Sequence, residues 1–236
     1  MKILGIIPAR AGSKRLKNKN ILKIKNKPLI AWSILTAKKS KIFDKLIVST
    51  DSKKIAKISK KYGAEVPFLR PSKISGDNSK SSELILHAIN FYKNKKIIFD
   101  YIILIEPTSP LREVKDFIAC FNLIKKNKIK SLVTISKIKS QHPRFLFKLS
   151  SRKKIKPYLN SWKNIHTRTQ DVEDLYFLDG TLYCSEVKTF IKNKTFYHKN
   201  TSAIIVPDWK AFEIDNYLDY KITECVMKNK KIKSNG

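Results

Sequence analysis

Glycine, cysteine and histidine are all scarce in this chain of 236 residues. It has 6 glycines and contains neither Gly-x-Gly-x-x-Gly nor Gly-x-x-x-x-Gly-Lys-Ser/Thr, which excludes both of these glycine-rich nucleotide-binding motifs. The 3 cysteines, Cys120, Cys184 and Cys225, have no Cys-x-x-Cys spacing, which argues against a zinc or redox site and predicts reduced thiols in the core. The 4 histidines form no metal-binding pattern.

Membrane and export signals are also missing. No apolar run approaches the roughly 18 residues that would span a bilayer. The start of the chain lacks the apolar core and cleavage site of a signal peptide. We therefore expect a cytoplasmic protein that does not bind membranes.

Acidic residues are few, because 19 Asp and Glu stand against 50 Lys and Arg and leave a formal net charge of +31. Such an excess favours an acidic partner, such as nucleic acid, anionic lipid or a phosphorylated substrate. The lysines are spread along the whole chain, which weakens the nucleic-acid interpretation without removing it. With 42% hydrophobic residues, the chain can bury a real core, and we expect one domain over residues 1–236.

The most informative stretch is 6–20, where an apolar run enters a loop rich in cations. A loop at the carboxyl end of a first strand can offer backbone N–H groups and positive charge to a polyphosphate. Gly12 would allow close approach, and Ser13 and Asn20 would add neutral donors. From composition alone, a solvated basic loop explains the stretch equally well. The cations of this stretch are Arg10, Lys14, Arg15, Lys17 and Lys19.

Downstream, β-branched runs alternate with segments of helical spacing. Strands are expected from Ile3 and at 45–50, 66–69, 101–105, 131–138, 175–185 and 203–206, with helices at 28–40, 52–62, 84–92, 113–127, 188–192 and 218–228. This alternation predicts a three-layer α/β fold with a mostly parallel, doubly wound sheet. The loops after Ala9, Thr50, Ile105 and Leu178 should then meet at one crevice.

The alternation breaks at about 139–175, where apolar residues such as Phe147, Leu149 and Trp162 alternate with basic ones. This pattern predicts a small antiparallel excursion. A dimerisation arm or a lid would have this composition, and so would a surface insertion that packs on itself.

Taken together, the motifs resemble those of the acylneuraminate cytidylyltransferase family, enzymes that join CMP to nine-carbon acidic sugars. They occur in the family's order over nearly the whole chain, which makes the match specific. The resemblance implies a fold like that of nucleotide-diphospho-sugar transferases. The matching segments are Ile-Pro-Ala-Arg-Ala-Gly-Ser-Lys at 7–14 with Lys19-Asn20, Ile-Val-Ser-Thr-Asp at 47–51, Leu-Arg-Pro at 69–71, Pro-Thr-Ser-Pro-Leu-Arg at 107–112, Gln-His-Pro at 141–143, Asp-Gly-Thr-Leu-Tyr at 179–183 and Glu-Ile-Asp at 213–215.

Family roles transfer to the matching positions as expectations. The resemblance implies that the CTP phosphates lie on the loop residues Arg10, Gly12, Ser13, Lys14, Lys19 and Asn20. Arg70 and Ser81 would contact the cytosine and ribose, with Asp77 nearby. Without the resemblance, Arg70 and Asp77 would be interpreted as an ordinary surface ion pair. Arg112 is expected only to cap its loop or pair with an acid.

A magnesium site is implied at Glu213-Ile214-Asp215, because alternate residues of an extended segment point to the same side. The family has Asp at both acidic positions, so Asp215 is the firmer ligand and Glu213 could act through water. Magnesium, with Arg10, Lys14 and Lys19, would neutralise the triphosphate. Two exposed acids on a turn are the alternative. No general base can be named.

The sugar site is implied at Glu106, Arg168, Asp179, Tyr183, Phe196 and Tyr197. The family usually has Gln and Asn where this chain has Glu106 and Asp179. An ionised carboxylate accepts hydrogen bonds but cannot donate one, which suggests a ligand with additional N–H or O–H donors. A di-N-acylated acid of the legionaminic or pseudaminic kind has such donors, although the sequence does not identify the sugar.

The sequence thus predicts a homodimeric cytidylyltransferase that uses CTP and a nonulosonic acid. One rival is a cytidylyltransferase for an eight-carbon 3-deoxy sugar acid, whose family has Gly-Asp-Glu-Pro where this chain has Glu-Pro-Thr-Ser-Pro. The other is a basic nucleic-acid-binding protein, for which the chain has no stacking-aromatic or helix-turn-helix pattern.

Overall fold

A six-stranded sheet forms the centre of the computed structural model, which describes residues 1–139, 141–159, 161–162 and 168–229. Its order is β10-β6-β9-β5-β1-β4. All neighbouring pairs are parallel except the two made by β9, which runs antiparallel to β5 and β6. The strands are β1 (Ile3–Pro8), β4 (Lys45–Ser49), β5 (Tyr101–Leu104), β6 (Ser131–Lys137), β9 (Tyr176–Glu186) and β10 (Ser202–Ile205).

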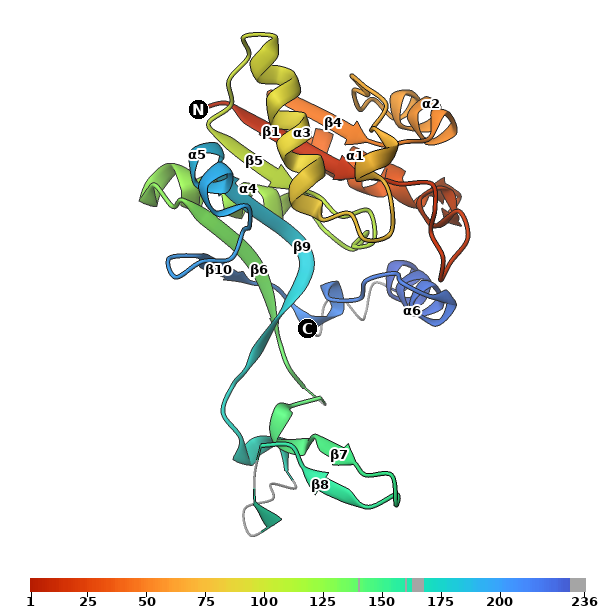
Figure 1. Cartoon of the computed structure of the whole chain (residues 1–236), viewed down its shortest axis with the longest axis vertical. Helices are drawn as coiled ribbons and strands as arrows, with labels where there is room; N and C mark the ends of the chain where they lie inside the picture. The colour runs from red at the N-terminus through yellow and green to blue at the C-terminus, as the bar shows by residue number, and fades with distance from the viewer. Residues whose placement is uncertain (140, 160, 163–167, 230–236) are drawn as a thin grey trace.

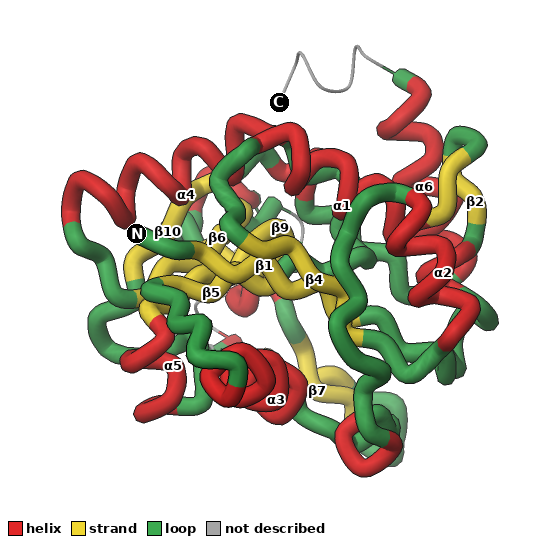
Figure 2. Tube along the Cα trace, turned by 90° about the horizontal axis from the view of Figure 1, so that it is seen from above, coloured by secondary structure: helices red, strands yellow, loops and turns green. Residues whose placement is uncertain are grey.

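Helices cover both faces of the sheet, as Figure 2 shows from above. One face packs against α1 (Leu29–Ser40), α2 (Lys53–Lys61) and α4 (Val114–Asn127), and the other packs against α3 (Ser81–Asn94) and α5 (Val187–Asn193). Alternation along β1 explains both contacts, since Ile3 and Ile7 point into the first layer and Leu4 and Ile6 into the second. The predicted three-layer, mostly parallel α/β fold is confirmed.

These core strands are apolar on both faces, as strands covered by two helical layers must be. Ile3, Leu4, Ile6 and Ile7 are all fully buried. Each such side chain stabilises the fold by roughly 1.5–3 kcal/mol relative to an exposed one. The sheet is therefore a rigid base from which the loops at its carboxyl edge extend.

The last helix, α6 (Tyr217–Lys228), lies outside the two layers. It packs beside the short hairpin of β2 (Lys23–Ile24) and β3 (Lys27–Pro28), where Ile24, Leu29 and Ile214 form a small separate core. An N-terminal capping box of Asn216 and Asp219 fixes where α6 begins, directly after the Glu213–Asp215 segment. Single 3-10 turns occur at Lys19–Ile21, Ser72–Ile74 and Asp208–Lys210.

Three expectations from the sequence are wrong in detail. Residues 66–69 form no strand in the described chain, because Glu65 and Leu69 make only isolated bridges to β4 and Thr50. Leu178 does not precede a loop, since it lies within β9. Because β9 is antiparallel, its early residues, and not its end, reach the carboxyl edge of β5.

Cys225 is an exposed thiol, whereas Cys120 and Cys184 are buried as expected.

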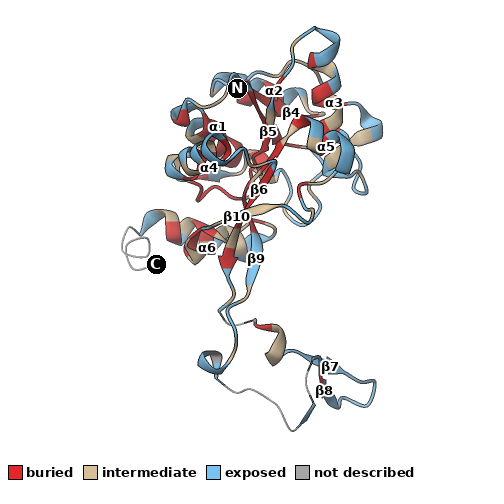
Figure 3. Cartoon of the chain, turned by 90° about the vertical axis from the view of Figure 1, so that its left-hand side faces the viewer, coloured by how far each residue is buried: buried red, intermediate tan, exposed pale blue. Residues whose placement is uncertain are grey.

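The predicted antiparallel excursion is present as an arm that extends away from the sheet (Figure 1). The extended ends of β6 and β9 lead into it, and it carries the antiparallel pair β7 (Phe147–Leu149) and β8 (Ile155–Pro157). Two 3-10 turns, Pro143–Phe145 and Thr169–Asp171, flank this pair. Most of the arm is exposed, in contrast to the buried sheet (Figure 3). Its exposed apolar side chains are Leu146, Phe147, Leu149, Ile155, Tyr158, Leu159 and Trp162, with Tyr176, Phe177 and Leu178 on the strand that leads back from it.

Candidate functional site

A cleft of about 500 Å³ opens at the carboxyl edge of β1 and β5, where the loops that follow these strands face α3 and the start of α6. This is the place that an open parallel sheet offers to a ligand. Ten of the residues expected from the sequence to form the site line it together: Arg10, Ser13, Lys14, Lys19, Asn20, Arg70, Asp77, Ser81, Glu106 and Asp215.

Two hydrogen bonds hold the loop after β1 in place. The side-chain amide of Asn20, which is 7% exposed, donates to the carbonyl oxygen of Arg10 at 3.0 Å. The N–H of Ala11 donates to Asp51 at 2.9 Å. Asn20 therefore acts on the shape of the loop as well as lining the cleft. Gly12 lies exposed on this loop, and a methyl group at its Cα would meet no atom within 4 Å.

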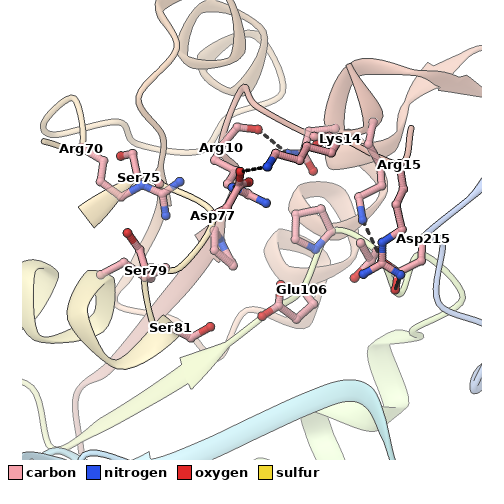
Figure 4. A pocket seen from close by; sticks show the side chains of 18 of the residues that line it. Arg10, Lys14, Arg15, Arg70, Ser75, Asp77, Ser79, Ser81, Glu106 and Asp215 are labelled. Carbon is pink, nitrogen blue, oxygen red and sulfur yellow. Dashed lines mark hydrogen bonds and ion pairs between the residues drawn. The ribbon is translucent and has the colours of Figure 1, made fainter. Parts of the chain in front are cut away.

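Two carboxylates bind four of the loop's cations (Figure 4). Asp77 accepts from Arg10 and pairs with Lys14, each at 2.5 Å, and these two contacts lower the pKa of Asp77. Asp215 pairs with Lys19 at 3.0 Å and with Arg15 at 3.1 Å. A triphosphate that entered the cleft would present its own oxygens to the same cations.

Arg70 is the buried cation of the cleft, with 5% of its surface exposed. Its Nε and one terminal nitrogen have no hydrogen-bond partner among the described residues. Burial lowers the pKa of this guanidinium, and the Asp51 carboxylate opposes that effect. Buried donors without a partner cost free energy. A ligand that brought acceptor groups to this wall of the cleft would bind the Arg70 donors and remove that cost. Figure 4 shows Arg70 beside Ser75 and near Ser79, on the side of the cleft opposite Asp215.

Glu106 lies at the floor of the cleft, at the end of β5. Burial raises the pKa of Glu106 to about 7, and the nearby Glu213 carboxylate adds to this effect. The Glu213 carboxylate accepts from Ser109 at 3.0 Å, and its pKa is also raised by burial. Near neutral pH, a large fraction of the Glu106 carboxyl groups is therefore protonated and can donate a hydrogen bond, as a glutamine amide could.

Asp179 is 1% exposed, and its carboxylate contacts the protein itself. It accepts from Thr134 at 2.6 Å, from Ser136 at 3.1 Å and from the backbone N–H of Thr181 at 2.8 Å. These contacts fasten β9 to β6. Asp179 therefore stabilises the strands beneath the cleft, and its carboxylate oxygens already have protein partners.

The aromatic residues expected at the sugar site differ in burial. Phe196 is 5% exposed and packs on Phe190 with ring centroids 4.8 Å apart, as a core residue does. Tyr183 and Tyr197 meet edge to face at 6.0 Å, and 49% of Tyr197 is exposed. Burial raises the pKa of the Tyr183 phenol, which keeps it neutral. Arg168 is exposed, belongs to the arm and does not line the cleft.

Sequence reasoning missed several cleft residues. The resemblance does not include Arg15 among the phosphate-binding residues, yet Arg15 lines the cleft and pairs with Asp215. Ser75 and Ser79 flank Asp77, and the polar run from 75 to 81 was the signal that could have identified them. Arg112 does not line the cleft, but its buried guanidinium donates to the loop that does.

The geometry combines a cationic loop, a carboxylate, and a buried arginine with two nitrogens that have no hydrogen-bond partner in the described part of the chain. Residues 4–232 match the family described as cytidylyltransferase. The chain belongs to the cytidylyltransferase family. This result confirms the resemblance drawn from the motifs.

Relatives and solved structures agree with this assignment. This cytidylyltransferase is 34% identical to the CMP-N,N'-diacetyllegionaminic acid synthase of Legionella pneumophila, over 96% of this chain and 97% of that protein. It is 30% identical to the pseudaminic acid cytidylyltransferase of Campylobacter jejuni, with 97% of both chains covered. A CMP:2-keto-3-deoxy-manno-octonic acid synthetase solved with CTP shares the fold at a TM-score of 0.71 and 14% identity, over 97% of this chain and 99% of that one. Among the described residues, no helix is long and apolar enough to cross a membrane.

Proposed function

We propose that this cytidylyltransferase joins CMP from CTP to a nine-carbon acidic sugar of the sialic, legionaminic or pseudaminic type, in the cytoplasm, for surface glycan synthesis. The observation that carries the proposal is the cleft, which pairs a cationic loop with the unpaired Arg70 donors. The names of the relatives support the nine-carbon acids as substrates. The eight-carbon alternative has support from a solved structure only at 14% identity, which indicates the fold alone.

In the proposed reaction, the anomeric hydroxyl of the sugar attacks the α-phosphorus of CTP. A new P–O bond forms, the bond between the α-phosphorus and its bridging oxygen breaks, and pyrophosphate leaves with that oxygen. Arg10, Lys14 and Lys19 neutralise the triphosphate, which is the main task of the protein in such transfers. Arg70 and Ser81 bind the nucleoside side. The proton of the hydroxyl is lost to solvent, and no residue is assigned as its base.

The acids beside the cleft suit magnesium, which binds proteins through one or two carboxylates and completes its shell with substrate phosphates and water. Asp215 lines the cleft, and its charge raises the pKa of Glu213, so the two carboxylates are close. No group of three or more His, Cys, Asp or Glu side chains suited to a metal occurs within the described ranges. Asp215 would hold the ion with Glu213 as a second carboxylate, and the bound ion would supply positive charge to the phosphates.

A thermal-shift comparison of the four nucleoside triphosphates tests the nucleotide half of the proposal. CTP with magnesium is expected to raise Tm selectively, because a ligand that binds only the folded state stabilises it by mass action. The nucleic-acid alternative predicts no selectivity for CTP. It predicts binding to DNA or RNA that weakens steeply as salt rises.

The raised pKa of Glu106 predicts that kcat/KM for the sugar depends on pH. Because its pKa is raised to about 7, the neutral acid dominates below this pH and the carboxylate above it. The carboxylate repels an acidic sugar, so kcat/KM for the sugar should fall as pH rises above about 7, by up to about tenfold per unit. Glu106→Gln removes the titrating group and should give a flat profile from pH 6 to 8.5. The same decline in the variant would show that another group controls the profile.

We also propose that the arm pairs with a second copy to form a homodimer. Its exposed apolar side chains, such as Leu149 and Ile155, which lie opposite each other across β7 and β8, form a surface that water disfavours. Replacing both by lysine should convert a dimer into a monomer in light scattering after gel filtration. Ile98, which is 71% exposed outside the arm, supplies the control, and Ile98→Lys should leave the dimer intact. A monomeric parent protein would contradict the proposal.

A further inference from the structure

Arg112 ends the Pro-Thr-Ser-Pro-Leu-Arg loop after β5, and its side chain is almost completely buried, with 3% exposed. Its Nε donates to the carbonyl oxygen of Thr181. One terminal nitrogen donates to Ser33 Oγ at 3.2 Å. The other donates to the carbonyl oxygens of Glu106 at 3.1 Å and Gly180 at 3.4 Å. A single guanidinium thus joins the two ends of its own loop to α1 and to β9.

The carbonyl groups that Arg112 binds belong to residues in or next to the cleft. Glu106 begins the loop at the floor of the cleft. Gly180 has φ of +69°, and a Cβ there would overlap the Glu213 carboxylate, which lies 1.4 Å from the ideal Cβ position. Arg112 therefore holds the Glu106 loop against the part of β9 on which Glu213 packs. Tyr183 follows three residues later on the same strand.

Four acidic side chains act on the buried charge of Arg112. Burial lowers the pKa of the Arg112 guanidinium to about 10, and the acidic groups of Asp116, Glu106, Asp179 and Glu213 oppose this effect. Its guanidinium also lies over the Phe117 ring, 5.8 Å from the centroid, on the side of α4. A buried cation with these neighbours reduces the repulsion between acids that the loop and β9 bring together.

We infer that Arg112 is a positioning residue for the sugar half of the site, holding the Glu106 loop and residues 179–183 of β9 in a fixed relation. This inference rests on the proposed function only in assigning that half to the sugar. Arg112 makes none of these bonds to the cations of the loop after β1, so CTP binding should depend on Arg112 less than sugar binding does. Lysine cannot replace it, because one ammonium group cannot reach carbonyls on different sides as the planar guanidinium does.

The test compares Arg112→Lys with Lys210→Met as a matched control. Lys210 is also a fully buried cation and binds Asp116 at 2.6 Å and Glu113 at 3.0 Å, but it makes no bond to the Glu106 loop or to β9. Arg112→Lys loses buried hydrogen bonds and Lys210→Met loses buried ion pairs, so both variants should lower Tm. Only Arg112→Lys should loosen the cleft.

Two readouts are measured in each variant. Amide hydrogen exchange in 106–111 and 179–183 should become at least tenfold faster in Arg112→Lys and stay unchanged in Lys210→Met. With saturating CTP, KM for the acidic sugar should rise at least tenfold in Arg112→Lys while KM for CTP changes less than threefold. Ser33→Ala removes the bond from Arg112 and the bond from Ser33 Oγ to the Glu106 carbonyl oxygen at 3.4 Å, and it keeps the charge. It should show the same pattern at a twofold to fivefold level if Arg112→Lys does not fold.

The inference is overturned if exchange in both segments is unchanged in Arg112→Lys, if KM rises equally for sugar and CTP, or if Lys210→Met gives the same pattern. Failure of the proposed function is distinguishable. In that case the parent protein releases no pyrophosphate with any nonulosonic acid, and the exchange comparison still decides whether Arg112 positions the loop.

Discussion

Lys19→Ala is expected to lower pyrophosphate release by about a thousandfold in kcat/KM, which corresponds to about 4 kcal/mol of transition-state stabilisation. The Lys19 side chain is 16% exposed, so its charge is less screened by water than that of a surface lysine. It lines the cleft and pairs with Asp215 at 3.0 Å. Removing it takes away the least exposed lysine of the loop after β1 and leaves Arg15 as the cation that pairs with Asp215 among the described residues.

Lys17→Ala is the matched control for this change. Lys17 lies two residues away in the same loop, is exposed and does not line the cleft. The same loss of formal charge there should reduce turnover by less than twofold. Near-normal turnover in Lys19→Ala, with an unchanged circular dichroism spectrum, would remove Lys19 from the mechanism. Equal losses in both variants would point to net charge as the cause.

Asp215→Asn is expected to reduce kcat at least a hundredfold at low magnesium, with partial recovery as magnesium is raised. The amide keeps the volume of the side chain but not the negative charge that a divalent cation needs. The side chain of Asp215 is 43% exposed and lies beside the loop after β1. From there its carboxylate could bind a metal ion that also contacts a triphosphate. The measurement is kcat as a function of magnesium concentration at saturating CTP.

Asp174→Asn controls for the loss of one surface carboxylate, since Asp174 pairs with Lys137 at the base of the arm and is not part of the cleft. Its magnesium dependence should match that of the parent protein. A parental magnesium curve in Asp215→Asn, with normal kcat, would exclude Asp215 as a magnesium ligand. Loss of activity that no magnesium concentration changes would assign Asp215 to holding Lys19 and Arg15.

Much of the cleft could be predicted because parallel strands deliver their carboxyl ends to one edge. Arg10 and Glu106 follow β1 and β5, so a correct strand assignment was enough to bring them together. Asp77 required more, because its contact with Arg10 spans 67 residues of sequence and depends on how the loop before α3 folds back. The resemblance implies only that Asp77 lies near Arg70 and Ser81, so its pairing with Arg10 and Lys14 comes from the structure. The catalytic and binding roles of these residues stay predictions.

The direction of β9 and the hydrogen-bond partners of the buried side chains beneath the cleft could not be predicted from the sequence. The pattern of apolar and polar residues along a strand does not reveal its direction, so the antiparallel pairing of β9 with β5 could not be predicted. The resemblance implies that Asp179 lies beside the sugar, whereas in the structure Thr134 and Ser136 bind its carboxylate in the interior. Arg112 acts mainly on backbone carbonyl groups, which leave no trace in a sequence.

The most direct test is pyrophosphate release from CTP with purified protein, magnesium and a panel of acidic sugars. The panel contains N-acetylneuraminic acid, a di-N-acetylated legionaminic acid, a pseudaminic acid and an eight-carbon 3-deoxy acid. The account predicts that at least one nine-carbon acid gives pyrophosphate and CMP-sugar in equal amounts, and that ATP, GTP and UTP do not replace CTP. No release with any nine-carbon acid, or a preference for the eight-carbon acid, would contradict it.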